Sequence, residues 1–182
     1  MRWEELFADL EAQLEEAERA EHQAEVADRT RRELARVRLV DRLRAAVGSS
    51  LTVVVGAAGR VRGRLVDVGP DWLLLQEDGR DALVPVSAVT TVLGLGGRAA
   101  GPPRPASVAA RLTLGTALRG LVRDRATVRV TTVDGADWTG TLDRVGADFV
   151  DSSEGPVDEG RDARARGVRS VPFAALAVIR AR

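Results

Sequence analysis

The spacing of apolar residues changes after about Val47. From Trp3 to that point the chain has neither Pro nor Gly and is dominated by Leu, Ala, Glu and Arg, a composition typical of a helix. Beyond it, Leu51, Val53 and Val55 recur at every second position, which is the period of a half-buried β-strand. The pattern therefore predicts a long helix followed by a β-rich region.

The predicted helix carries a narrow apolar seam in its first half. Phe7, Leu10 and Leu14 follow one another at spacings of three and four, and Trp3 extends the seam toward the start of the chain. Residues 4–28 hold ten acidic side chains and one Arg, whereas residues 29–44 hold seven Arg and two acids. We interpret the seam as a coiled-coil surface for a partner helix. The alternative is a solvated helix whose charges suit its own dipole.

The strand-rich pattern occurs twice. GRLVDVGPDWLLLQE begins at Gly63, and GTLDRVGADFVDSSE begins at Gly140, seventy-seven positions later, with Gly, Leu, Val, Gly, Asp, an aromatic residue and Glu at matching places. VPFAALAVI from Val171 likewise matches VPVSAVTTV from Val84, after ten additional residues in the intervening loop. Each copy accommodates five short strands, which suit a small barrel, so we interpret the chain as an internal duplication.

Two motifs of the repeat have counterparts in a known family. Gly63-Arg-Leu65 is followed by Asp71 and Trp72, much as Gly-x-Ile is followed by Asp and an aromatic residue in the Sm-like proteins of the bacterial Hfq type. The segment VPVSAVTTV aligns with that family's second motif, roughly Val-Tyr-Lys-His-Ala-Ile-Ser-Thr-Val. The repeat thus resembles the Sm-like fold, and the resemblance implies barrels whose edge strands pair, either within a tandem chain or onward into a ring.

The positions that handle RNA in the Hfq type carry other residues here. Pro85, Val86 and Ser87 stand in the places of the Tyr, Lys and His, and the second copy has Pro-Phe-Ala at 172–174. The whole chain also resembles an actinobacterial family whose members are sometimes labelled Fis-type regulators. A Fis-like protein ends in a helix-turn-helix, whereas this sequence is predicted to end in a strand, AVIRAR.

The predicted fold class is mainly β with helices: a long N-terminal helix plus two small five-stranded Sm-like or SH3-type barrels, each preceded by a helix. The segment GLGGRAAGPPRPAS, with four Gly and three Pro, predicts a flexible linker. The predicted domain boundaries are 1–47 for the helix, 48–95 for the first barrel, 96–107 for the linker and 108–182 for a helix with the second barrel.

Composition narrows the chemistry. Basic and acidic residues balance at 27 each, so the chain has no overall basic field for nucleic acid. The absence of Cys excludes disulfides, thiolate metal sites and cysteine nucleophiles, and His22 is the single histidine. We therefore predict no catalytic residue, no metal, no cofactor and no small-molecule substrate. The charged N-terminal region and the lack of a long apolar run predict a cytoplasmic protein without a membrane partner.

Two candidate binding surfaces remain. The helix seam, formed by Trp3, Phe7, Leu10 and Leu14, suits a protein partner or self-association. Arg60, Arg62 and Arg64 share one face of a predicted strand and could bind phosphates, with ordinary solvated surface as the alternative. We predict a non-enzymatic binding or assembly module that acts through the N-terminal helix and the barrel edges, or alternatively an RNA- or DNA-binding regulator.

Overall fold

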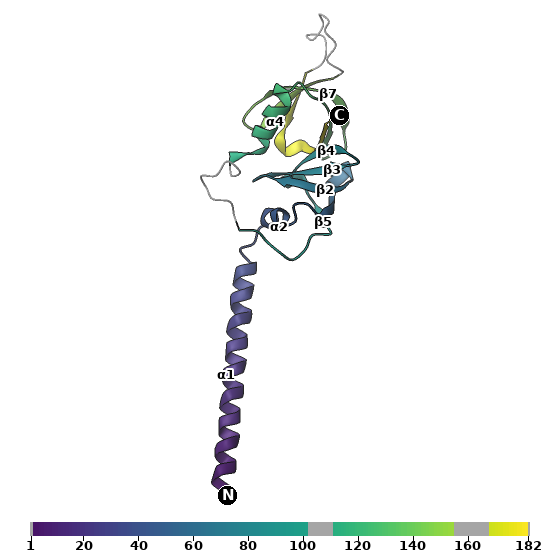
Figure 1. The fold of residues 1–182 in the computed structure, drawn as a ribbon. Coiled ribbons are helices and arrows are strands. Elements are labelled where there is room, and N and C mark those ends of the chain that lie inside the picture. Colours follow the sequence, from purple (N-terminus) through teal and green to yellow (C-terminus); the bar gives the residue numbers. More distant parts are fainter. Residues whose placement is uncertain (1, 102–110, 155–167, 182) are drawn as a thin grey trace, which may run out of the picture. The chain divides into compact units, whose positions relative to one another are not determined.

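The computed structural model describes residues 2–101, 111–154 and 168–181, and within these ranges the side chains of residues 2, 4–12, 17, 20 and 154 lie outside the description. It divides into two compact units, Met1–Arg38 and Leu39–Arg182. In the first unit, α1 spans Arg2–Leu34 (Figure 1). The continuous helix predicted as far as residue 47 is wrong, because α1 ends at Leu34 and its end tightens into bonds three residues apart, such as Val37 N–H to Leu34 O at 3.1 Å.

The second unit opens with a separate short helix, α2, which spans Leu39–Ala45. Val40 and Leu43 of α2 are buried in the core beneath the first copy of the repeat. A helix of this length is marginal by itself, so its packing on the sheet stabilises it. A longer helix, α4, spans Leu114–Arg123 and buries Leu114 and Leu118 beneath the second copy.

Ten strands of the second unit form one antiparallel sheet, in the order β5-β1-β2-β3-β4-β10-β6-β7-β8-β9. Their bounds are β1 Ser50–Val54, β2 Arg60–Val68, β3 Trp72–Glu77, β4 Arg80–Pro85, β5 Thr91–Leu93, β6 Thr127–Thr132, β7 Asp137–Val145, β8 Phe149–Glu154, β9 Val168–Pro172 and β10 Leu176–Ala181. Short 3-10 helices η1 Gly56–Ala58, η2 Val86–Ala88 and η3 Phe173–Ala175 join some of them.

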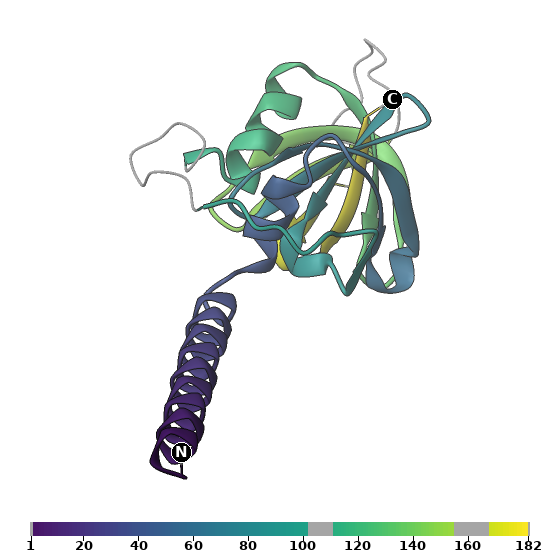
Figure 2. The same cartoon turned by 60° about the horizontal axis from the view of Figure 1, so that its bottom comes forward.

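The fold class predicted from the sequence, a long helix plus two five-stranded barrels, is therefore wrong. The strands of the two copies belong to a single sheet, because β4 of the first copy pairs with β10 of the second. In this pairing Leu83 lies opposite Ile179 and Ala82 lies opposite Arg180. In the turned view of Figure 2, β10, drawn in yellow, lies among strands of both copies. We call β4 and β10 the junction strands.

The repeated sequence nevertheless has a repeated structural meaning. Each copy contributes its strands in the same order, β5-β1-β2-β3-β4 and then β10-β6-β7-β8-β9. The second strand of each copy shifts register at matching places, after Leu65 in β2 and after Leu142 in β7. Such bulges bend a strand and increase its twist, so both copies curve at the same point.

The shared Gly-x-Asp-aromatic motif also has one structural role in both copies. Gly69 N–H donates to Trp72 O at 2.9 Å, and Gly146 N–H donates to Phe149 O at the same distance. A Cβ atom added at Gly69 would lie 2.3 Å from Trp72 Nε1, and one added at Gly146 would lie 2.2 Å from the Phe149 ring. Glycine is required because the aromatic ring folds back over the loop that precedes it.

Each copy of the repeat supplies residues to the hydrophobic core of the other copy, at or next to the junction strands. Ala177 and Val178 of β10 belong to the core of the first copy. Trp72 and Leu83, from β3 and β4, belong to the core of the second copy. On β4 the neighbours Leu83 and Val84 point to opposite faces and belong to different cores. On β10 the register shifts between Leu176 and Val178, and the successive residues Ala177 and Val178 both belong to the first core.

Candidate interaction surfaces

The junction between the copies is reinforced by Asp71, which immediately precedes β3, and by Trp72, the first residue of β3. Thr113 occupies the N-cap position of α4 without a side-chain capping bond, and Asp71 from the first copy takes that role. Its Oδ1 accepts a hydrogen bond from Leu114 N–H at 2.8 Å, and Trp72 Nε1 donates to Leu112 O at 2.6 Å. The sequence placed Asp71 and Trp72 in the repeated motif but did not predict either of these contacts.

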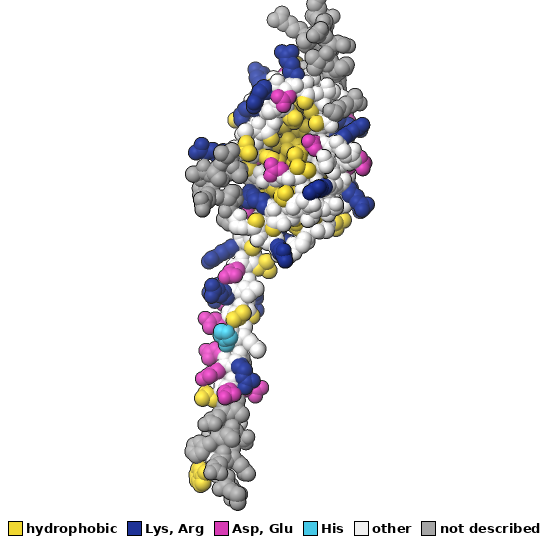
Figure 3. Space-filling view, viewed as in Figure 1, with side chains coloured by type: hydrophobic (Ala, Val, Ile, Leu, Met, Phe, Trp, Pro, Cys, Tyr) yellow, Lys and Arg dark blue, Asp and Glu magenta, His cyan; other side chains and the backbone are white. Residues whose placement is uncertain are grey.

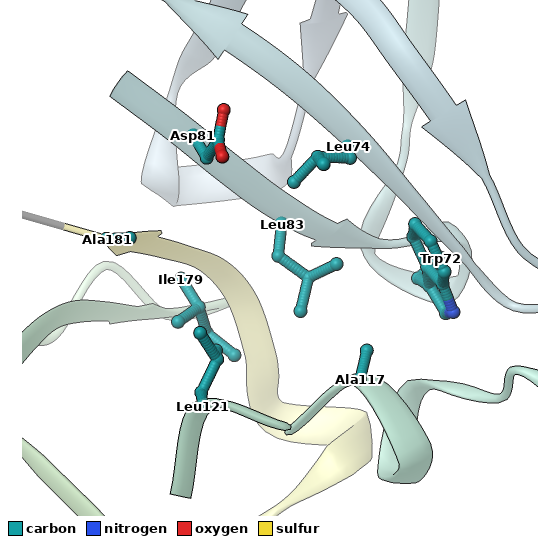
Figure 4. Close-up of a pocket in the computed structure, with 8 residues that line it drawn as sticks. All are labelled: Trp72, Leu74, Asp81, Leu83, Ala117, Leu121, Ile179 and Ala181. Carbon is teal, nitrogen blue, oxygen red and sulfur yellow. The ribbon is translucent and has the colours of Figure 1, made fainter. Parts of the chain in front are cut away.

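An apolar pocket lies over the same junction. Figure 3 shows apolar side chains gathered on this face of the second unit, with charged side chains around them. The pocket has a volume of about 220 Å³, and its walls come from both copies and from α4 (Figure 4). It is lined by Trp72, Leu74, Asp81, Leu83, Ala117, Leu121, Ile179 and Ala181. A single carboxylate, that of Asp81, lies among otherwise apolar lining residues, so the pocket offers an apolar surface and little catalytic chemistry.

The sheet ends in two open edges. Among the strands that the structure describes, β5 at one end pairs only with β1, and β9 at the other end pairs only with β8. Leu93 on β5 is 49% exposed and Val168 on β9 is 60% exposed. Unpaired backbone groups on an edge strand are available to another strand. These edges are therefore candidate interaction surfaces, and we call them the β5 edge and the β9 edge.

A second hollow, of about 380 Å³, adjoins the β9 edge and we call it the β9 groove. Trp138 forms part of its wall, and its Nε1 donates to Ser152 Oγ at 3.1 Å. The Arg169 guanidinium lies 5.1 Å from the centre of the Trp138 ring, within the range of a cation–π interaction. Val171 and Pro172 of β9 complete the wall beside the edge.

Beside the β9 groove lies the buried carboxylate of Asp151, which accepts hydrogen bonds from two side chains. Ser170 Oγ donates to Asp151 Oδ1 at 2.6 Å, and Arg144 Nη2 donates to Oδ2 at 2.8 Å. The hydrogen bond from Ser170 has the largest effect and that from Arg144 the next largest, and together they hold the pKa of Asp151 below its ordinary value. The carboxylate therefore stays charged at neutral pH and is satisfied within its own copy.

Arg60, Arg62 and Arg64 are all exposed on β2, while Val61 and Leu65 on the opposite face are buried. The structure thus brings the three predicted residues to one face of one strand. Arg62 N–H lies 3.5 Å from Glu77 Oε1, which places an acidic group beside the row. The matching positions of β7 are Asp137, Thr139 and Thr141, so the row is a feature of the first copy alone.

The predicted helix seam is only partly described. Trp3 is 72% exposed and Leu14 is 62% exposed on α1. The side chains of Phe7 and Leu10 lie outside the described residues, although both belong to α1. Within the described side chains of the predicted seam, both apolar residues are therefore exposed on α1.

Little in the described residues supports catalysis or metal binding. No group of three or more His, Asp or Glu residues is arranged to hold a metal ion within the described ranges. His22 is exposed on α1. None of the described helices is long and apolar enough to cross a membrane. No family model, no curated protein and no solved structure matches this chain.

Proposed function

We propose that this protein is a non-enzymatic binding and assembly module that associates with other protein chains through α1 and through the open edges of its sheet. The observation that carries the proposal is the pairing of β4 with β10, where one copy of the repeat uses an edge strand to bind the other. The same kinds of edge strand are left open at β5 and β9.

The exposed apolar side chains of α1 give the proposal a second point of contact. Trp3 and Leu14 would each bury a large apolar surface against a partner helix. Burying one such side chain contributes roughly 1.5–3 kcal/mol, and about 1.4 kcal/mol corresponds to a tenfold change in a binding constant.

The helix contribution is tested by replacing the four residues of the helix seam with Ser in the full-length chain, namely Trp3, Phe7, Leu10 and Leu14. We expect the association constant, measured by light scattering over a range of concentrations, to fall at least about tenfold because the apolar contact surface is lost. The matched control replaces four polar residues of α1, Gln13, Glu16, Glu18 and Gln23, with Ser. Equal association of the two variants would contradict the role of the helix seam.

A second candidate function rests on the exposure of the arginine row. Three guanidinium groups at alternate positions of β2 face water together, and charged donors of this kind bind phosphate oxygens well. We propose RNA or DNA binding as the alternative role of this face. The balanced overall charge and the neighbouring Glu77 make it the weaker of the two proposals.

The alternative is tested by changing Arg60, Arg62 and Arg64 to Ser and measuring binding to a single-stranded oligonucleotide at several salt concentrations. If the row contacts phosphates, the slope of log K against log salt should become shallower by up to about 2, since each neutralised phosphate of a single strand contributes roughly 0.7. The control variant changes Arg98, Arg111 and Arg123 to Ser, and all three are exposed outside the row. The control therefore has the same net charge as the variant of the row. An identical slope in both variants would refute the row as a nucleic-acid site.

A further inference from the structure

The two open edge strands of the sheet, β9 and β5, are the counterparts of the two strands that pair between the copies within the chain, β4 and β10. By sequence, VPFAALAVI matches VPVSAVTTV, so β9 is the counterpart of β4 and β5 is the counterpart of β10. Inside the chain, the β4-type edge of the first copy pairs with the β10-type edge of the second. We propose that the β9 edge of one molecule pairs with the β5 edge of a second copy of this chain. This inference rests on the proposed assembly function and names its partner.

The internal pairing fixes the register of the contact between molecules. The pair Leu83 and Ile179 corresponds to Ser170 of one molecule opposite Val92 of the second molecule. Ala82 opposite Arg180 likewise corresponds to Arg169 opposite Leu93. In the single chain Leu93, Arg169 and Ser170 are exposed and Val92 is half-buried, so three of the four residues that would meet are exposed.

In this contact, β5 of the second molecule lies over the β9 groove of the first molecule. In the first copy of the repeat, Val61, Ala82 and Val84 are all but completely buried, in one core with Ala177 and Val178 of β10. Their counterparts in the second copy are Trp138, Arg169 and Val171, and all three line the β9 groove. The counterpart of Val178 is Thr91, which is exposed on β5 and would enter this groove.

The loops on either side of the junction repeat in the same way. Within the chain, a Cβ atom added at Gly56 would lie 3.4 Å from Val133 O, and one added at Gly135 would lie 3.5 Å from Ala57. The η1 turn of the first copy therefore contacts the β6–β7 turn of the second. Between molecules the same two turns meet with their roles exchanged, because each is the counterpart of the other. Val133, which is 39% exposed, would then be covered.

The contact between molecules is more polar than the internal one. Thr91 replaces Val178, and Arg169 and Ser170 replace Ala82 and Leu83. Charged and polar residues on an edge strand oppose indiscriminate pairing, and β5 offers only three residues. We therefore infer a reversible, selective head-to-tail contact, which either closes into a ring or continues as a filament.

The chain has no cysteine, so two introduced thiols report on this register without interference. One full-length variant carries Leu93→Cys and another carries Arg169→Cys, both at exposed positions. The two are mixed, oxidised under native conditions and resolved without reductant. We expect about tenfold more cross-linked dimer than in a mixture of Leu93→Cys with Val168→Cys, because a disulfide requires Cα atoms within roughly 7 Å and side chains that face each other. Val168 is also exposed on β9 but lies one residue out of register.

A single chain carrying Ala82→Cys and Arg180→Cys serves as the positive control, since these residues are paired inside the molecule. Its disulfide establishes that this pair of positions can be bridged, and circular dichroism establishes that every variant has the native fold. Equal dimer yields in the two mixtures would overturn the edge contact. If that occurs while the helix-seam variant still loses association, the assembly function stands and only the β9–β5 pairing fails. If both tests are negative, the assembly function fails as well.

Discussion

Gly63→Ala is expected to lower the free energy of unfolding by roughly 3 kcal/mol or more. Gly63 lies in β2 opposite β3, where an added Cβ atom would be 2.2 Å from Gln76 O and 2.7 Å from Gln76 C. The obstructing atoms are backbone, so neither strand can yield without breaking sheet hydrogen bonds. Urea unfolding, followed by tryptophan fluorescence, measures the change.

Gly120→Ala provides the matched control. Gly120 lies within α4, and no atom comes within 4 Å of an added Cβ atom there. Alanine in place of glycine inside a helix stabilises by about 0.5–1 kcal/mol. A loss of stability at Gly120 equal to that at Gly63 would show that the close approach of β2 to Gln76 is not the cause.

Trp72→Ala is expected to cost about 3–5 kcal/mol, the usual range for removing a buried tryptophan or phenylalanine side chain. The Trp72 side chain is 6% exposed, belongs to the core of the second copy and bonds to Leu112 O ahead of α4. Its removal therefore weakens the junction between the copies as well as the local packing. Thermal unfolding measured by calorimetry should show a clearly lower Tm.

Two further variants separate the causes of this loss. Trp72→Phe keeps an aromatic ring and removes the bond to Leu112 O, so it should cost about 1 kcal/mol. Phenylalanine is compatible with the loop because Phe149 occupies the matching place in the second copy. Phe149 is only half-buried, so Phe149→Ala should cost less than Trp72→Ala. If Phe149→Ala proved as costly as Trp72→Ala, the junction would not be the source of the effect.

Most strand positions could be predicted from alternation alone. Arg60, Arg62 and Arg64, predicted to share one face of a strand, are exposed together on β2, and Val61 and Leu65 on its other face are buried. Comparing the two copies also supports the strand assignment. Although the second copy has ten additional residues between β8 and β9, these strands occupy the positions of β3 and β4 in the repeat. Local patterns are sufficient here because each hairpin joins neighbouring segments of the chain.

The pairing of β4 with β10 within the chain is one of the two alternatives that the sequence left open, the other being pairing onward into a ring. The sequence could not decide between them because the paired residues lie almost a hundred positions apart. A signal was nevertheless present. In β4 the residues Ala82–Pro85 are all buried, and in β10 the residues Leu176–Ile179 are all buried. Continuous apolar runs indicate a strand covered on both faces, whereas the open strands β5 and β9 lack them. The break after α1 had no comparable signal, since residues 35–38 contain neither Pro nor Gly.

The exchange of core residues across β4 and β10 has a consequence for synthesis of the chain. The first copy of the repeat emerges from the ribosome well before β10, which supplies Ala177 and Val178 to its core. During that interval β4 presents an unpaired edge that carries Leu83 and Val84, a combination that favours aggregation of nascent chains. Slow translation of the segment between the copies should therefore lower the yield of folded protein, and early access to β10 should raise it.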